Sequence, residues 1–81
     1  MKIKVLLFAA LKDQFASSQI ELDVPASATV ADLRRSLVTE QPALEDLLSR
    51  SGFGLGDEFV EDDFALSEGM ELACIPPVSG G

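Results

Sequence analysis

Two apolar segments, one near each end of the sequence, constrain the fold more than any other feature. Residues 2–8, KIKVLLF, alternate as a strand does, and their second face changes from charged to apolar along its length. Residues 70–75, MELACI, are apolar on both faces. Strands that are covered on both sides lie inside a sheet rather than at its edge. We therefore expect these segments to be central strands that pair in parallel, joined through a helix.

The residues between them predict a second strand and a helix. QIELDV, at residues 19–24, alternates cleanly and predicts an N-terminal hairpin whose connection holds one short helical turn. Thr29 and Asp32 have the spacing of a capping box and precede apolar residues at helical spacing. A helix is therefore expected from about Val30 to Glu40. Pro42 disfavours a helical conformation in the residue before it, which places a break there.

The second half of the chain predicts shorter elements. PALEDLLSR, at residues 42–50, is typical of a second short helix, with Gly52 placed to terminate it. The glycine-rich run at residues 52–63 indicates short strands around Leu55 and Phe59–Val60. Together the elements predict an α+β fold of the β-grasp (ubiquitin-like) layout, a mixed sheet packed against a helix. We expect this domain at residues 1–75 and a flexible, extended C-terminal Gly-Gly tail at residues 76–81.

Composition excludes several classes of function. The 81 residues include no histidine and one cysteine, and the formal net charge is −8. The usual general base near neutral pH and the commonest metal ligand are therefore missing, and we expect no metal and no stably bound cofactor. The acidic charge argues against binding nucleic acid, and no apolar run approaches the roughly 20 residues that span a bilayer. We expect a cytoplasmic protein without nucleic-acid or membrane partners.

Four side-chain features have ordinary structural interpretations. Cys74 alternates with Leu72 and is predicted to be a core residue without a catalytic role. The acidic run at residues 61–63 is predicted to be a solvated loop rather than a metal site or a site for a basic partner. Arg34 and Arg35 are predicted to lie on the solvated face of the helix, with an ion pair across a complex as the alternative for one of them.

The final residues, IPPVSGG, carry the chemical interest. Two prolines favour a stiff, extended exit from the domain, and six extended residues reach about 20 Å. Gly80 and Gly81 lack Cβ atoms, so they can pass through a narrow slot into another protein's active site. A terminal carboxylate must be activated before a nucleophile can attack it. Because the chain has no phosphate-binding loop pattern, a partner must handle ATP. A frayed terminus is the alternative.

An apolar patch is expected where this tail leaves the domain. Exposed apolar patches mark protein interfaces, so we predict that a partner binds there. The alternative is that Leu6 and Phe8 pack beneath a loop of the same domain. The predicted partner-binding residues are Leu6, Phe8, Ile75, Pro76, Pro77, Val78 and Ser79.

These segments resemble a known family. IPPVSGG, the preceding LSEGMELA, the opening KVLLFAALKD and the helix TVADLRRSL together resemble the small subunit of molybdopterin synthase over essentially the whole chain. Ubiquitin-like modifiers and the thiamine-pathway sulfur carrier also end in Gly-Gly, but PPVSGG is characteristic of the molybdopterin branch.

The resemblance implies a sulfur carrier that is not an enzyme on its own. An E1-like adenylyltransferase would activate Gly81 with ATP, and a sulfur-donating protein would convert it to a thiocarboxylate. The tail, with Gly80 giving access, would enter the large subunit of molybdopterin synthase in a heterotetramer. There sulfur would pass to cyclic pyranopterin monophosphate to form the dithiolene of molybdopterin.

Two departures and three alternatives accompany this resemblance. Gly56 stands where the family commonly has Asn, and Gly69-Met70-Glu71 replaces the usual Gly-Asp-Glu turn. The first departure concerns a loop and a candidate interface hydrogen bond. The alternative functions are a protein modifier conjugated through Gly81, a thiamine- or tRNA-type sulfur carrier, and a plain interaction domain.

Overall fold

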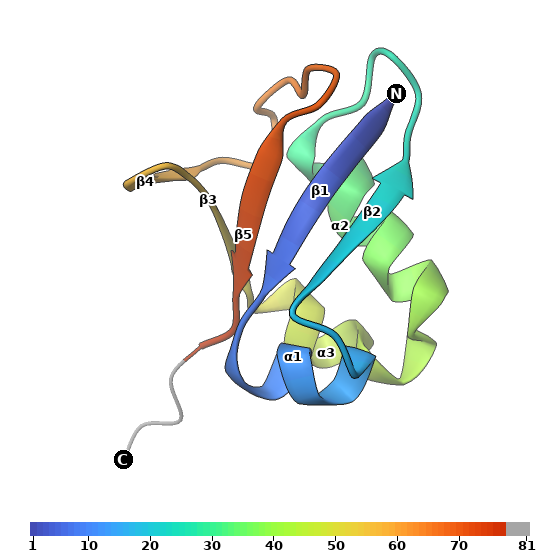
Figure 1. Cartoon of the computed structure of the whole chain (residues 1–81), viewed down its shortest axis with the longest axis vertical. Coiled ribbons are helices and arrows are strands. Elements are labelled where there is room, and N and C mark those ends of the chain that lie inside the picture. Colours follow the sequence, from blue (N-terminus) through green and yellow to red (C-terminus); the bar gives the residue numbers. More distant parts are fainter. Residues whose placement is uncertain (78–81) are drawn as a thin grey trace.

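The computed structural model describes residues 1–77. Its strands and helices follow one another in an order close to the one expected (Figure 1). They are β1 (Lys2–Leu7), α1 (Ala9–Phe15), β2 (Gln19–Asp23), α2 (Val30–Glu40), a 3₁₀ turn η1 (Pro42–Leu44), α3 (Glu45–Ser49), β3 (Gly52–Leu55), β4 (Glu58–Val60) and β5 (Glu71–Ile75).

The five strands form one mixed sheet in the order β2-β1-β5-β3-β4. β1 and β5 pair in parallel, with Val5 opposite Leu72, and the other three pairings are antiparallel. The predicted central parallel pair is therefore confirmed. α2 crosses one face of this sheet (Figure 1), so the expected β-grasp arrangement is confirmed as well.

The core lies between the sheet and the helices. The alternation in β1 buries Ile3, Val5 and Leu7, as predicted. Leu33 and Leu37, one turn apart on α2, are fully buried with them. Each fully buried aliphatic side chain of this kind contributes roughly 1.5–3 kcal/mol.

The connection between β1 and β2 differs from the prediction of one short helical turn. It forms α1, in which Leu11 is fully buried and Phe15, four residues later, packs against the core. The helix ends at Ala16, which has a left-handed conformation with φ of 56°. Two apolar residues at helical spacing are enough to stabilise α1, because the rest of the domain supplies the surface on which they pack.

α2 has the predicted bounds. Asp32 accepts a hydrogen bond of 2.9 Å from the backbone N–H of Thr29, so the capping box forms with Asp in the place of the longer Glu. The helix breaks at Gln41, whose φ of −138° and ψ of 78° are non-helical, as Pro42 predicted.

The predicted role of Gly52 as a helix terminator is wrong. α3 ends at Ser49 followed by Arg50 in a right-handed conformation, and Gly52 instead opens β3 opposite Ile75. Ser51 replaces the glycine cap, because its hydroxyl donates a 2.8 Å hydrogen bond to the carbonyl of Leu47.

Gly56 lies in the two-residue turn between β3 and β4, with φ of 62°. Gly and Asn are the residues that adopt this left-handed conformation most readily. The substitution of Gly for the family's usual Asn is therefore compatible with the same backbone.

Candidate partner-binding face at the end of strand 5

β5 carries the chain from the middle of the sheet to the residues that precede the tail. Leu6 on β1 lies opposite Ala73 on β5, and Gly52 on β3 lies opposite Ile75. Residues paired in this way point to the same side of a sheet. They therefore belong to the face that α2 does not cover, which we call the open face. From β1, β3, β4 and β5 it presents Leu6, Gly52, Gly54, Phe59, Ala73 and Ile75.

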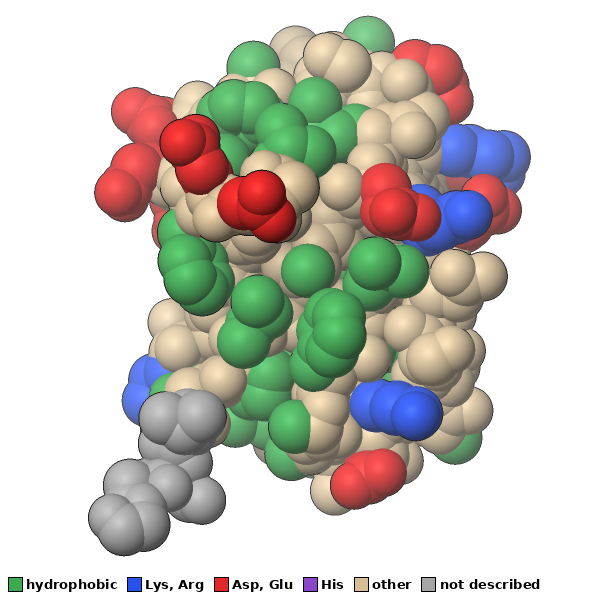
Figure 2. All heavy atoms as spheres, turned by 60° about the vertical axis from the view of Figure 1, so that its left-hand side comes forward, with side chains coloured by type: hydrophobic (Ala, Val, Ile, Leu, Met, Phe, Trp, Pro, Cys, Tyr) green, Lys and Arg blue, Asp and Glu red, His purple; other side chains and the backbone are tan. Residues whose placement is uncertain are grey.

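The open face and its border expose large apolar side chains. Among the described residues, Phe59, Phe8 and Ile75 are exposed to 69%, 46% and 38%, and Leu6 is half-buried. Figure 2 shows the side of the molecule that carries β3, β4 and β5, with hydrophobic side chains gathered across its middle and acidic side chains above them. Grouped apolar exposure of this kind is typical of a protein-binding surface.

Phe59 is the member of this face that sequence reasoning missed. Its ring lies over Gly52, where an added Cβ would be 2.8 Å from the ring atom Cε1. The ring therefore contacts the backbone of β3 instead of a side chain. Two glycines on the same face of one strand beside an aromatic residue on the next strand were the available signal.

The predicted partner-binding residues occupy different environments. Phe8 follows β1 in an extended conformation, and its carbonyl accepts the N–H groups of Leu11 and Lys12, so the ring stays at the surface. Pro77 is exposed, whereas Pro76 is buried in the domain and presents little surface to a partner. The remaining predicted residues lie outside the described part of the chain: Val78, Ser79, Gly80 and Gly81.

Cys74 is a core residue, as predicted. Its side chain is fully buried on the face of β5 opposite to Ile75. Burial raises the pKa of the Cys74 thiol to about 12, against a smaller opposing effect of the Arg34 charge. Because the thiolate is the reactive form of cysteine, burial and the raised pKa make this thiol unreactive in the folded protein.

The prediction for Arg34 is wrong, although that for Arg35 is correct. The Arg34 side chain is only 18% exposed, and it donates 2.6 Å hydrogen bonds to the carbonyls of Leu48 and Ser51. The same guanidinium donates to Asp62 at 2.7 Å. It thereby joins α2 to the turn before β3 and to the loop after β4, and supports the strands that carry the open face.

The comparisons with known proteins decide the family. The model of the ThiS family matches residues 5–81. The chain belongs to the ThiS family. It is 35% identical to a molybdopterin synthase sulfur carrier subunit of Chlamydomonas reinhardtii, and the match covers 100% of both chains.

Two solved structures have folds similar to that of this ThiS-family chain. The crystal structure of small archaeal modifier protein 1 from H. volcanii matches with a TM-score of 0.82 and 32% identity, over 95% of this chain and 98% of that one. A complex of subunits 1 and 2 of the molybdopterin-converting factor from Helicobacter pylori matches with a TM-score of 0.68 and 22% identity, over 100% of both chains. At that identity the second likeness shows the fold alone.

The described part of this ThiS-family chain also bears on metal binding and on membrane insertion. Within residues 1–77, no group of three or more His, Cys, Asp or Glu side chains is arranged to hold a metal ion. In the same described part, no helix is long and apolar enough to cross a membrane.

Proposed function

We propose that this protein is the sulfur-carrier small subunit of molybdopterin synthase, with Gly81 as the residue that carries sulfur. The observation that carries the proposal is the 35% identity to a sulfur carrier subunit over the whole of both chains. The fold agrees with it, because β5 leads from the centre of the sheet to Pro77 beside an exposed apolar face. The proposal includes a cytoplasmic location.

The chemistry begins at the Gly81 carboxylate. An E1-like enzyme would join this carboxylate to the α-phosphate of ATP, which releases pyrophosphate and leaves an acyl adenylate. Sulfide-level sulfur from a donor protein would then attack the carbonyl carbon and displace AMP, leaving a thiocarboxylate. The chain needs no cofactor and no catalytic base of its own for these steps, since the activating partner uses the ATP.

The carrier would next deliver its sulfur inside the large subunit. Gly80 and Gly81, without Cβ atoms, suit a narrow channel to that active site. Each thiocarboxylate would give one sulfur atom to cyclic pyranopterin monophosphate and return to a carboxylate with an oxygen atom from water. Two such transfers would complete the dithiolene, and the large subunit would supply the catalytic groups.

The open face is the proposed contact with the large subunit. Phe59, Ile75 and the neighbouring Phe8 offer apolar area that a partner can bury. The H. pylori complex of subunits 1 and 2 supports a partner of this kind. The proposed assembly is a heterotetramer with two small subunits on a dimer of large ones.

A protein modifier is the second candidate function. It is favoured by the likeness to the small archaeal modifier protein of H. volcanii, which covers almost all of both chains. In that case Gly81 would form an isopeptide bond with a lysine of a target protein. A carrier of the thiamine or tRNA type would share the thiocarboxylate but deliver it to a different acceptor.

Intact-mass measurement separates these functions. The full chain, incubated with an E1-like enzyme, ATP and a sulfur source, is expected to gain the mass of one oxygen-to-sulfur exchange and then to lose it when the large subunit and cyclic pyranopterin monophosphate are added. A chain extended by one residue after Gly81 is the control, and it should stay unmodified and equally stable. Sulfur transfer from that extended chain, or lysine conjugates in place of the thiocarboxylate, would overturn the proposal.

A further inference from the structure

β2 forms an edge of the sheet that the proposed function does not use. The N–H of Val24 bonds to the carbonyl of Met1, and the N–H of Leu7 bonds to the carbonyl of Ser18, each at 2.9 Å. In an antiparallel pair such contacts recur at every second residue. Glu21 and Asp23 therefore direct their backbone N–H and carbonyl groups away from β1, toward the open side of the edge.

The beginning of this edge is already occupied. The hydroxyl of Ser17 donates a 2.6 Å hydrogen bond to the carbonyl of Gln19 and accepts the Gln19 N–H at 3.3 Å. Ser17 thus satisfies both outward groups of Gln19. The part of the edge that is open to another strand begins at Glu21.

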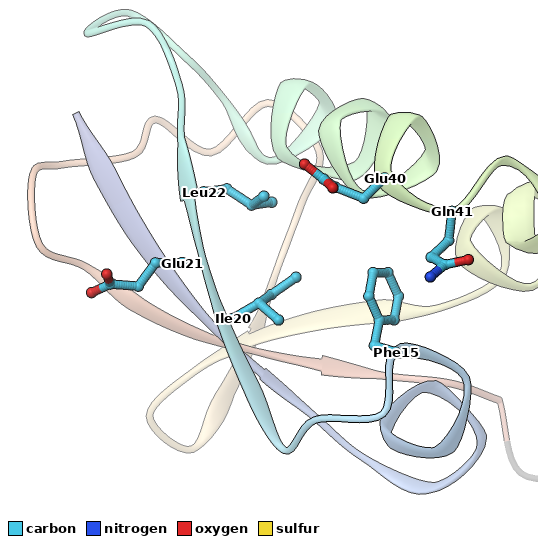
Figure 3. Close-up of a pocket in the computed structure, with 6 residues that line it drawn as sticks. All are labelled: Phe15, Ile20, Glu21, Leu22, Glu40 and Gln41. Atoms are coloured by element: carbon cyan, nitrogen blue, oxygen red, sulfur yellow. The ribbon is translucent and has the colours of Figure 1, made fainter.

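A groove of about 320 Å³ runs beside this open part, between β2 and the ends of α1 and α2. In Figure 3 the side chains of Ile20 and Leu22 point toward α2, and the ring of Phe15 stands between Ile20 and Gln41. Glu21 points to the other side of the strand. The described residues that line the groove are Phe15, Ile20, Glu21, Leu22, Glu40 and Gln41.

The acidic residues beside β2 indicate which kind of partner this edge of the sheet binds. None of the lining residues is basic, and within residues 1–77 neither Glu21 nor Glu40 takes part in a salt bridge. A second copy of this chain, with a net charge of −8, would bring like charges together. A basic segment would instead meet two carboxylates that form no salt bridge in this part of the chain, Glu21 on the outer side of the strand and Glu40 beside the groove.

We propose that the β2 edge binds an extended basic segment of another protein as an added strand. The backbone of that segment pairs with Glu21 and Asp23, and its apolar side chains enter the groove over Ile20 and Phe15. Its alternate residues, lysine or arginine, lie on the other face of the added strand, to which Glu21 points. Glu40 adds negative charge on the groove side. This is the mode in which a sheet edge supplies affinity through main-chain hydrogen bonds and pockets supply specificity. Because β2 and β4 are opposite edges of the sheet, the site is separate from Phe59 on the open face.

The test is a titration of the ¹⁵N-labelled full chain with a short, end-blocked peptide that alternates valine and lysine. The amides of Glu21 and Asp23 are expected to shift, and added salt should weaken the binding. A peptide that alternates valine and glutamate is the matched control and should bind at least roughly tenfold more weakly. Equal binding of the two peptides, or shifts confined to Phe8 and Phe59, would overturn the proposal.

Variants locate the site. The double variant Glu21→Lys/Glu40→Lys should weaken the lysine peptide about tenfold or more, whereas Glu58→Lys, on the other edge strand, should change its affinity less than about twofold. Glu21→Pro removes an outward N–H that β1 does not use, so it should weaken binding beyond the effect of Glu21→Ala. Self-association without peptide binding would instead make a second copy the occupant and refute a basic partner.

Discussion

Phe59 and Gly52 form a contact across β3 and β4 in which an aromatic ring lies on bare backbone. The ring is 69% exposed, yet a Cβ added at Gly52 would lie 2.8 Å from its Cε1 atom and 3.0 Å from its Cδ1 atom. Ile75 lies opposite Gly52 on the neighbouring strand. The glycine therefore sets the height of Phe59 above the sheet beside the last residue of β5.

Replacing Gly52 with alanine is predicted to move this ring. The ring is the end of an exposed side chain, so it can shift, and the free energy of unfolding should change by no more than about 1 kcal/mol. Affinity for the large subunit should fall, because Phe59 leaves its position on the open face. Thermal unfolding and a binding titration with the large subunit check the two effects.

Gly54→Ala is the matched control on the same strand and face. A Cβ at this position would meet only the carbonyl of Glu58, at an ordinary 3.6 Å. The substitution should leave the ring in place and keep or slightly raise stability, because alanine loses less backbone entropy on folding than glycine. Equal losses of affinity in Gly52→Ala and Gly54→Ala would rule out a specific role for the Phe59 ring.

Phe8→Glu is predicted to abolish complex formation while the isolated domain stays folded. The Phe8 ring is already 46% exposed, so the change should cost only about 1 kcal/mol of stability. A carboxylate buried in an apolar interface would lose its hydration, which should weaken binding by well over tenfold. Circular dichroism and size-exclusion chromatography with the large subunit measure both, with Phe8→Leu as the apolar control. Unfolding of the variant would make Phe8 a core residue and remove it from the binding face.

Ala16→Gly is predicted to stabilise the protein. Ala16 caps α1 with φ of 56° and ψ of 34°, and its N–H bonds to carbonyls of the preceding helical turn. Glycine adopts this conformation without the clash of a Cβ atom, which is worth up to about 1 kcal/mol. Ala10→Gly, inside the same helix, should destabilise the protein instead. Urea unfolding of the two variants compares them, and a shift of both in the same direction contradicts the argument.

Most of the fold could be predicted because apolar and polar residues alternate along its strands. The pattern in residues 2–7 and the double-sided apolarity of β5 identified the central pair, and Thr29 with Pro42 identified both ends of α2. The full length of α1 was harder to predict, because packing of its apolar residues against the rest of the domain stabilises this short helix. Such packing is a tertiary property that a local pattern does not contain.

The candidate site was predictable in part for the same reason. Phe8 and Ile75 lie at the surface near the end of β5, as their positions in strands indicated. Phe59 was missed because its importance comes from a glycine on the neighbouring strand, and Pro76 is buried although its neighbour Pro77 is exposed. The register between β3 and β4 decides the position of the Phe59 ring, and neither strand's sequence contains that register alone.

Arg34→Met is predicted to destabilise the domain by about 2 kcal/mol or more. The guanidinium bonds to two carbonyls, of Leu48 and Ser51, and lies 5.0 Å from the centre of the Phe53 ring. Methionine fills the space of the stem but leaves those carbonyls without a charged donor. Arg35→Met is the neighbouring control, because Arg35 is 72% exposed and, within residues 1–77, forms a salt bridge with Asp32 alone. Chemical unfolding should show a small change for the control, and equal losses would refute the assignment.

Asp32 is predicted to make stability depend on pH in the acid range. The hydrogen bond from the Thr29 backbone is the main cause that lowers the pKa of Asp32 below its ordinary value of 3.8. Desolvation opposes it, and the Thr29 hydroxyl and Arg35 lower the pKa by smaller amounts. A carboxyl whose pKa is lower in the folded state binds fewer protons there than in the unfolded state.

Its contribution is therefore complete above pH 3.8 and is lost as the pH falls from that value through the folded pKa. Asp32→Asn keeps an acceptor oxygen for the Thr29 N–H but removes the charge. It should be less stable than the natural chain at neutral pH, and the difference should shrink below pH 3.8. Urea unfolding of both chains across this pH range measures the difference in the free energy of unfolding. A difference that stays constant with pH would mean that the charge of Asp32 does not stabilise the helix cap.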